Sequence, residues 1–151
     1  MPKFVILNNV SSPQRLSDAA RTYYSLVKER DYAFVVTRAT GMAAQVGIPE
    51  VSKIAYRLGR LFISLPTLKD AVEVLGLNKL YLLVPSTVGE FTDLSTISLG
   101  DRDAFAICGV DDGFSRSELG LGTPVSTDFI TEYLPPAASV ALISVLTMRH
   151  K

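Results

Sequence analysis

Short apolar runs alternate along the chain with segments of helical periodicity, and this alternation constrains the fold more than any other feature. Five runs and one shorter extended piece are found: FVILNN (4–9), YAFVV (32–36), LFISL (61–65), KLYLLV (79–84), AFAIC (104–108) and TPVS (123–126). Strands that are apolar on both faces are typical of parallel sheets covered by helices on both sides. The sequence therefore predicts an α/β fold with a mostly parallel, five- to six-stranded sheet in one domain, residues 1–151.

Helix signals lie between these strands. Ser12 as N-cap and Pro13 at N1 begin a helix that we expect to reach about Arg30. A second helix starts at Pro49 and ends at Gly59, and a third is capped by Thr67 and stops at Gly76. The segment YLPPAASVALISVL (133–146) predicts a final, proline-led helix. Residues 85–103 read as a loop with at most one helical turn, and residues 109–122 read as a loop.

Composition limits the cellular setting. Hydrophobic residues make up 48% of the chain, which is more than a monomer of 151 residues needs and suggests contact with another subunit. No apolar run is long enough for a membrane span, and the N-terminal run is too short for a signal peptide. The single cysteine, Cys108, follows an apolar strand and is expected to be a buried structural thiol. We expect a cytoplasmic protein.

The net charge is zero, but the charges are unevenly distributed. Residues 1–60 hold nine basic and four acidic residues, so the remaining chain is acidic. This asymmetry is compatible with one face for a polyanion, and equally with ordinary solvated surfaces.

Most familiar catalytic motifs are missing. The chain has no phosphate loop of the GxxxxGK[ST] type, no GxGxxG after the first strand, no GxSxG and no Cys/His cluster with metal-ligand spacing. The one histidine, His150, is expected to be a solvated residue near the terminus. Five acids could in principle hold magnesium in a nuclease, although a solvated loop is the favoured interpretation: Asp101, Asp103, Asp111, Asp112 and Glu118.

Three loops are expected to meet at the carboxyl ends of the strands, where ligands bind in such folds. They are VPST (84–87), GVDDGFS (109–115) and TPVSTDFITEYLPPAAS (123–139). Together they offer backbone amides and small residues, which suits a cofactor with an adenine and a ribose held largely by main chain. Asp111 could accept a ribose hydroxyl or balance a sulfonium. The alternative is that residues 109–122 form only a surface loop.

Three motifs resemble those of the SpoU-like branch of the SPOUT superfamily, which are trefoil-knotted RNA methyltransferases that use S-adenosylmethionine. In the first motif, Asn-x-Gly-x-x-x-Arg, this chain has Arg15, Ser17 and Arg21. In the second, a strand followed by Gly-x-Glu and a further glycine, it has Gly109, Asp111 and Gly113, with one residue fewer before the last glycine. In the third, Ser-Leu-Asn-Val-Ser-Val-Ala, PPAASVA replaces the asparagine by Ala137 and keeps Ser139. The chain is similar to a divergent, small, archaeal-type member.

The resemblance implies methylation of rRNA or tRNA with S-adenosylmethionine as cofactor, a C-terminal trefoil knot, and a homodimer formed through the final helix. It implies Arg21 as the catalytic residue near the acceptor or its phosphate. The cofactor-binding residues it implies are Val84, Pro85, Ser86, Gly109, Val110, Asp111, Gly113, Pro124, Val125, Leu134, Ala137 and Ser139.

Two basic rows are candidates for contact with RNA. The first is Arg15, Arg21 and Lys28 on the first helix, with Tyr24 between them, and the second is Lys53, Arg57 and Arg60 on the second helix. Ordinary solvated helix faces remain an alternative. So do two other functions: a non-catalytic RNA- or nucleotide-binding domain, and a metal-dependent, RecB-like nuclease, for which no convincing Asp…Glu-x-Lys core is found.

Overall fold

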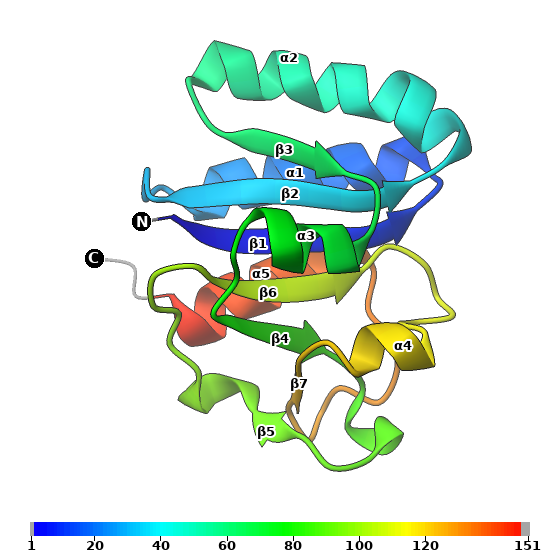
Figure 1. Cartoon of the computed structure of the whole chain (residues 1–151), viewed down its shortest axis with the longest axis vertical. Coiled ribbons are helices and arrows are strands. Elements are labelled where there is room, and N and C mark those ends of the chain that lie inside the picture. The colour runs from blue at the N-terminus through cyan, green and yellow to red at the C-terminus, as the bar shows by residue number, and fades with distance from the viewer. Residues whose placement is uncertain (1, 149–151) are drawn as a thin grey trace.

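A single sheet of seven parallel strands forms the centre of the molecule in the computed structural model, which describes residues 2–148. The strand order is β3-β2-β1-β6-β4-β7-β5, so the central strand, β6, comes from the last third of the chain and pairs with the first strand, β1 (Figure 1). The strands are β1 (Lys3–Val10), β2 (Tyr32–Ala39), β3 (Phe62–Leu65), β4 (Lys79–Leu83), β5 (Thr92–Asp93), β6 (Asp103–Cys108) and β7 (Thr123–Ser126).

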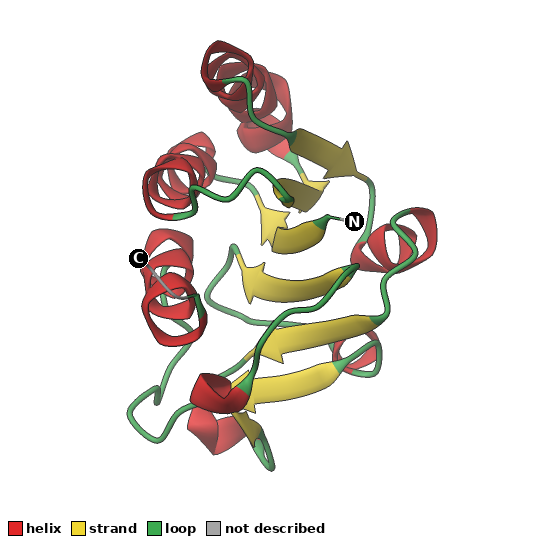
Figure 2. Ribbon diagram, turned by 90° about the vertical axis from the view of Figure 1, so that its left-hand side faces the viewer, coloured by secondary structure: helices red, strands yellow, loops and turns green. Residues whose placement is uncertain are grey.

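Helices cover both faces of this sheet, in three layers (Figure 2). The α-helices are α1 (Pro13–Leu26), α2 (Ile48–Leu58), α3 (Leu68–Val74), α4 (Arg116–Leu119) and α5 (Pro136–Thr147). Helices α1, α2 and α5 lie on one face, and α3 and α4 lie on the other. Alternate residues of β1 supply both cores: Val5 and Leu7 face the first set of helices, and Phe4 and Ile6 face the second.

The predicted fold class is confirmed: the chain is α/β, and every strand pairing is parallel. Two predicted loops contain more structure than expected. Residues 85–103 hold two short 3₁₀ helices, Ser86–Val88 and Leu94–Thr96, and the two-residue strand β5. Residues 109–122 hold α4, which a capping box of Ser115 and Glu118 begins. Elements of two to four residues have no periodicity that a sequence could reveal.

Helix α1 ends at Leu26, so the prediction that it continues to Arg30 is wrong. The cause is a contact made by a residue far along the chain. Arg60 donates to the carbonyl of Val27 at 2.7 Å, and its guanidinium lies over the rings of Tyr23 and Tyr24 at 5.8 and 5.3 Å from their centroids. Val27 takes an extended conformation, and the chain leaves the helix there.

A π-helix, Ala43–Gly47, precedes α2 and was not predicted. Gly47 in this turn packs closely on the start of α1, because a β-carbon there would lie 3.0 Å from Leu16 Cδ2. The predicted basic row on α2 needs correction. Helix α2 ends at Leu58, Gly59 has a left-handed conformation, and Arg60 turns inward to the two tyrosine rings.

Helix α5 begins with Pro135 as N-cap and Pro136 at N1. Val140 and Ile143 are buried beneath it against the sheet, whereas Val145 on the opposite side is 69% exposed. One side of the helix is therefore buried on the sheet, and Val145 on the other side is apolar and exposed, where the expected homodimer contact would lie. The trefoil knot stays a prediction, and His150 lies outside the described residues.

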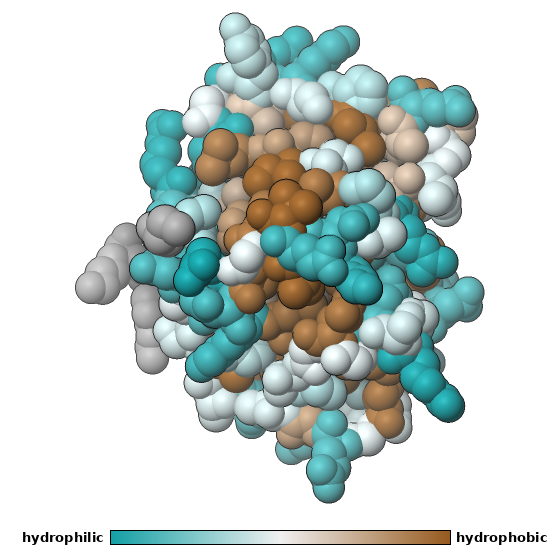
Figure 3. Space-filling view, in the orientation of Figure 1, coloured by the Kyte–Doolittle hydropathy of each residue, from teal (hydrophilic) through white to brown (hydrophobic). Residues whose placement is uncertain are grey.

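The α3–α4 face is covered less completely than the other, because these two helices are only seven and four residues long. Figure 3 views this face and shows apolar residues gathered in a band across its centre. In the described part of the chain, residues 2–148, no helix has the length and apolar character needed to cross a bilayer.

Candidate functional site

The three loops predicted to form a site do meet at the carboxyl edge of the sheet. They border an open hollow of about 630 Å³, which we call the loop hollow. Pro85, Asp111 and Pro135 come from the three predicted loops in turn. The full lining is Pro85, Thr87, Val88, Asp111, Thr131, Glu132, Tyr133 and Pro135. A concave site of this size at the ends of parallel strands is the usual place for a ligand in this class of fold.

Hydrogen bonds fix the loop after β4 to the segment that leads into α5. Val84 N–H donates to the carbonyl of Val125 at 3.0 Å, and Ser86 N–H donates to the carbonyl of Ile130 at 2.7 Å. The Thr87 hydroxyl adds a longer bond to the carbonyl of Thr131 at 3.4 Å. The two loops therefore form one continuous wall made mostly of main chain.

The loop after β6 depends on two glycines for its path. Gly109 donates from its N–H to the carbonyl of Asn8 at 2.8 Å, and a β-carbon there would lie 2.5 Å from the carbonyl oxygen of Asn9. Gly113 has a φ of +82°, and the ring of Tyr133 occupies the space that a β-carbon would need. The backbone approaches its neighbours so closely at these two positions that only a glycine fits without a shift.

Tyr133 closes one side of the hollow. Its ring meets that of Phe114 edge to face at a centroid distance of 6.2 Å, and its hydroxyl accepts from Phe114 N–H at 3.4 Å. Burial raises the pKa of Tyr133 above its ordinary value, so the phenol is neutral at physiological pH.

Arg15 holds the same loop from the first turn of α1. Its guanidinium donates to the carbonyl of Gly109 at 3.1 Å and pairs with Asp111, with Nη2 and Oδ1 3.1 Å apart. The Asp111 side chain is 82% exposed. Arg15, predicted to contact RNA, therefore makes these bonds to the predicted cofactor loop.

Several predicted cofactor residues lie behind the hollow. Val84, Leu134 and Ser139 border a void of about 10 Å³, which leaves room for a single water at most. Val125 is fully buried in β7, and Pro124 beside it pairs with Leu82 of β4. The other predicted cofactor residues lie close by in sequence: Ser86 follows β4, Val110 follows β6, and Ala137 is in the first turn of α5.

Arg21 lies elsewhere, between α1 and α2. Its Nε donates to the Ser17 hydroxyl at 3.3 Å, and its guanidinium lies 3.6 Å from the Glu50 carboxylate. With Ile54 and Arg57 it borders a shallow depression of about 280 Å³. Arg21 and Arg57, predicted for catalysis and for RNA contact, thus share one surface that is separate from the loop hollow.

The prediction that Arg21, Tyr24 and Lys28 share one exposed helix face is wrong, whereas contact of Lys28 with RNA stays a prediction. Lys28 follows the end of α1, and Tyr24 is 5% exposed in the core, where its hydroxyl donates to the carbonyl of Leu61 at 2.9 Å. Lys53 is exposed on α2 as expected.

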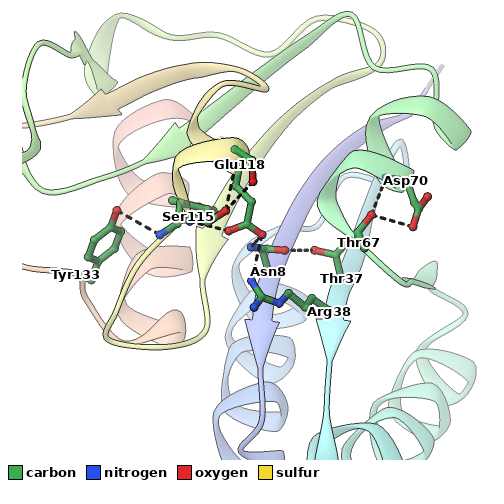
Figure 4. A network of polar contacts seen from close by, with 10 residues as sticks. Asn8, Thr37, Arg38, Thr67, Asp70, Ser115, Glu118 and Tyr133 are labelled. Atoms are coloured by element: carbon green, nitrogen blue, oxygen red, sulfur yellow. Dashed lines mark hydrogen bonds and ion pairs between the residues drawn. The ribbon is translucent and has the colours of Figure 1, made fainter.

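A second polar centre lies on the α3–α4 face and was missed in the sequence (Figure 4). Asn8 Nδ2 donates to Glu118 Oε2 at 2.8 Å, and the Thr37 hydroxyl donates to Asn8 Oδ1 at 2.8 Å. Glu118 Oε1 accepts from Ser115 N–H at 2.8 Å, and Arg38 Nη1 lies 3.6 Å from Oε2. The sequence feature that could have revealed this polar centre is the pair Asn8 and Asn9, which follows the apolar run of β1.

The Glu118 carboxylate is ionised although it is buried. Burial alone raises its pKa, but the hydrogen bonds from Ser115 and Asn8 and the nearby Arg38 guanidinium outweigh that effect and hold the pKa below its ordinary value. The backbone around this centre is strained: Asn9 and Arg38 have φ values of +65° and +54°. Such conformations cost about 1–3 kcal/mol outside glycine and gather at functional sites.

The acidic residues do not form a metal centre of the kind a nuclease needs. Asp101 precedes β6 and Asp111 follows it, and six strand residues separate the two by roughly 20 Å. Among residues 2–148, no group of three or more His, Cys, Asp or Glu side chains is arranged to hold a metal ion. Cys108 is buried as predicted, and burial raises the pKa of its thiol to about 12, which disfavours a nucleophilic thiolate.

Sequence comparison gives a family match. The model of the family described as RecB-family nuclease (DUF2122) matches residues 41–146. A protein of Aeropyrum pernix, named provisionally as type II restriction enzyme ApeKORF2002P, is 33% identical over 145 residues, which are 95% of this chain and 91% of that protein. A protein of Methanocaldococcus jannaschii, named provisionally as type II restriction enzyme MjaORF1200P, is 35% identical over 122 residues, which are 79% of this chain and 80% of that protein.

Structural comparison gives a different kind of neighbour. TrmJ from Z. mobilis ZM4 has a TM-score of 0.71 at 13% identity, over all of this chain and 70% of that one. The SpoU methyltransferase AviRb from Streptomyces viridochromogenes has a TM-score of 0.68 at 13% identity, over 95% and 57% of the chains. A structure concerned with 2-OH methylation of C/U34 on tRNA has a TM-score of 0.67 at 15% identity, over 95% and 91%. At such identities the likeness shows the fold, which is the SPOUT fold that the motifs indicated.

Proposed function

Because the chain belongs to the family described as RecB-family nuclease (DUF2122) and has the SPOUT fold, we propose that it is an RNA methyltransferase that uses S-adenosylmethionine, with rRNA or tRNA as substrate. The observation that carries this proposal is the loop hollow, where three loops of a SPOUT fold converge at the carboxyl edge of the sheet. The structural neighbours include proteins described as RNA methyltransferases, which supports RNA as the partner.

The chemistry of the loop hollow fits this cofactor. Its lining has two carboxylates, Asp111 and Glu132, and hydroxyls on Thr87 and Thr131, but no cationic side chain. Carboxylates suit a sulfonium and a ribose, and exposed main chain suits an adenine edge. When bound, S-adenosylmethionine supplies an activated methyl group, so the protein need only bind it and orient an acceptor.

The chain's own residues then have distinct roles. Asp111 and Glu132 would face the positive charge, while Arg15 positions Asp111 through their 3.1 Å ion pair. Gly109 and Gly113 let the loop follow its path along β1 and Tyr133. Ser139 and Leu134 would support the hollow from behind.

Arg21 fits the catalytic role best if a second copy of the chain supplies it, because in one chain it lies away from the loop hollow. An apolar groove of about 550 Å³ runs along α5, is lined by Phe129, Leu142 and Val145, and shares Thr131 and Glu132 with the loop hollow. A homodimer through this groove would bring the partner's surface to the edge of the site. Arg21 would then hold the acceptor nucleotide or its phosphate.

A nuclease is the second candidate, favoured by the names of the family and of its two relatives. Residues 2–148 contain no group of three or more His, Cys, Asp or Glu side chains arranged to hold a metal ion, which weighs against metal-dependent cleavage by this chain.

Calorimetric titration distinguishes the two candidates. We expect micromolar binding of S-adenosylmethionine and S-adenosylhomocysteine, one per chain or per dimer, and none of ATP with magnesium. Asp111→Asn should weaken binding of the positively charged methyl donor more than that of the neutral product. Absence of binding to both cofactor forms would contradict the methyltransferase, and metal-dependent cleavage of DNA or RNA by the same preparation would support the nuclease.

A further inference from the structure

A second cavity lies on the α3–α4 face, away from the loop hollow. It has a volume of about 350 Å³ and opens between the end of β2, the first turn of α3, and α4. We call it the α3–α4 cleft. Its lining includes Arg38, Thr67, Leu68, Lys69, Ser117 and Leu121, and Glu118 closes its inner wall.

Glu118 in the wall of the cleft is held from behind by a buried network, in which it accepts from Asn8 and Asn8 accepts from Thr37 (Figure 4). Both oxygens of the Glu118 carboxylate already accept hydrogen bonds, one from Asn8 and one from the backbone of Ser115. The acid is therefore occupied as an acceptor. Its charge is opposed by Arg38, whose side chain is 48% exposed and has further donors to offer.

The remaining lining combines positive charge with an apolar floor. Arg38 and Lys69 carry the cations, and Ser117 adds a hydroxyl. Leu121, which is partly exposed, supplies apolar surface, and Leu68 borders the cleft but is only 1% exposed. Asp70 on α3 does not line the cleft, and its carboxylate accepts from the Thr67 hydroxyl at 2.8 Å. Donors and cations at one end suit a phosphate, and an apolar floor suits a planar base.

The backbone of Arg38 strengthens the case for a binding role. A φ of +54° costs an arginine energy that a glycine would not incur, and the conformation is held by a bond from Arg38 N–H to the carbonyl of Pro66 at 2.9 Å. In this conformation the guanidinium reaches both Glu118 and the cleft.

We propose that the α3–α4 cleft binds one nucleotide unit, with its phosphate on Arg38 and Lys69 and its base against Leu121, beside the buried Leu68. The unit is either a free nucleotide or one residue of an RNA strand. The second source rests on the proposed function, under which RNA is the substrate. The site is separate from the loop hollow and needs no methyl donor.

Methyl resonances of ¹³C-labelled leucine test the proposal directly. The probes are AMP, UMP and inorganic phosphate, added without S-adenosylmethionine. We expect shifts at Leu68 and Leu121 with both nucleotides and smaller ones with phosphate. Lys69→Gln and Arg38→Gly should each weaken nucleotide binding at least fivefold. Lys79→Gln should change nothing, since Lys79 is exposed at the start of β4, on the opposite edge of the sheet.

The second part of the experiment measures the binding of a short single-stranded RNA to the same variants. If the cleft holds a residue of RNA, both variants should lower its affinity and reduce the salt dependence by roughly one phosphate contact each. If only the mononucleotides depend on the cleft, the ligand is a free nucleotide. Arg38→Gly relieves backbone strain and Lys69→Gln leaves the Glu118 network intact, so one folded variant is always available.

The proposal falls if neither nucleotides nor RNA shift the two leucines, or if Lys79→Gln weakens binding as much as Lys69→Gln. Failure of S-adenosylmethionine to bind would overturn the proposed function but leave a positive nucleotide titration standing.

Discussion

Asn8 donates a hydrogen bond of 2.8 Å to the carboxylate of Glu118, a residue 110 positions further along the chain. This bond joins the end of β1 to α4 and so fixes the loop that borders both the loop hollow and the α3–α4 cleft. The relationship makes Glu118 a residue on which stability and the geometry of both cavities depend.

Replacing Glu118 by alanine should lower the free energy of unfolding by about 2–3 kcal/mol, because the buried amide of Asn8 loses its acceptor. Urea denaturation at neutral pH measures the change. Glu73→Ala on the exposed side of α3 is the matched control and should stay within about 0.5 kcal/mol of the parent. Equal effects of the two substitutions would show that the network contributes nothing specific.

The same carboxylate predicts a dependence of stability on pH. The pKa of Glu118 in the folded protein lies below its ordinary value of 4.5. Its contribution is therefore complete above pH 4.5 and is lost as the pH falls from there through the folded-state pKa. Unfolding curves of the parent should lose stability in this window, and Glu118→Gln should remove part of the slope. A variant as steep as the parent would contradict the assignment.

Gly113→Ala should disrupt the loop hollow, since φ is +82° and the ring of Tyr133 fills the space of the new methyl group. We expect a loss of at least about 1–2 kcal/mol in stability and a displaced Tyr133. Tyrosine fluorescence and thermal melting report both. Gly120→Ala is the control, because Gly120 has a φ of −71° and the nearest atom to a new β-carbon is 3.5 Å away.

The two arginines of α1 should behave differently. Arg21→Ala should abolish methyl transfer while leaving cofactor affinity nearly intact, because Arg21 lies away from the loop hollow. Arg15→Ala should weaken cofactor binding several-fold, because it releases Asp111. Calorimetry and transfer of labelled methyl groups to RNA separate the effects. Loss of both properties in Arg21→Ala would remove its catalytic role.

The apolar groove along α5 predicts an association of two chains. Val145→Glu should shift the protein from dimer to monomer in analytical ultracentrifugation, since a charge would enter the apolar interface. Val74→Glu is a matched control, because Val74 is 68% exposed on α3, on the other face of the sheet, while Val145 is 69% exposed. A parent protein that is monomeric at high micromolar concentration would contradict the interface.

The fold could be predicted because long apolar strands and capped helices have local signatures. Ser12 and Thr67 do cap α1 and α3 as the sequence indicates. The early end of α1 could not be predicted from local sequence. Arg60, which follows α2, packs on Tyr23 and Tyr24 of α1 where the helix ends.

The candidate sites divide in the same way. Asp111 and Pro135 could be placed at the loop hollow because they follow or precede recognisable elements. Glu118 appeared only as one acid of a solvated loop, because its burial depends on a partner in the first strand. The role of Arg38 could not be predicted from the sequence. Its backbone has a left-handed conformation, which tertiary contacts impose and its sequence neighbours do not.

The pairing of β1 with the central strand, β6, has a consequence for how the chain is made. Strand β6 begins at Asp103, so the middle of the sheet is completed only after two thirds of the chain has left the ribosome. Until then one edge of β1 has no partner, and α1 lacks α5, which packs beside it. The nascent protein must therefore carry an open strand edge and an uncovered apolar core through most of its synthesis, which makes early protection by a chaperone valuable for this topology.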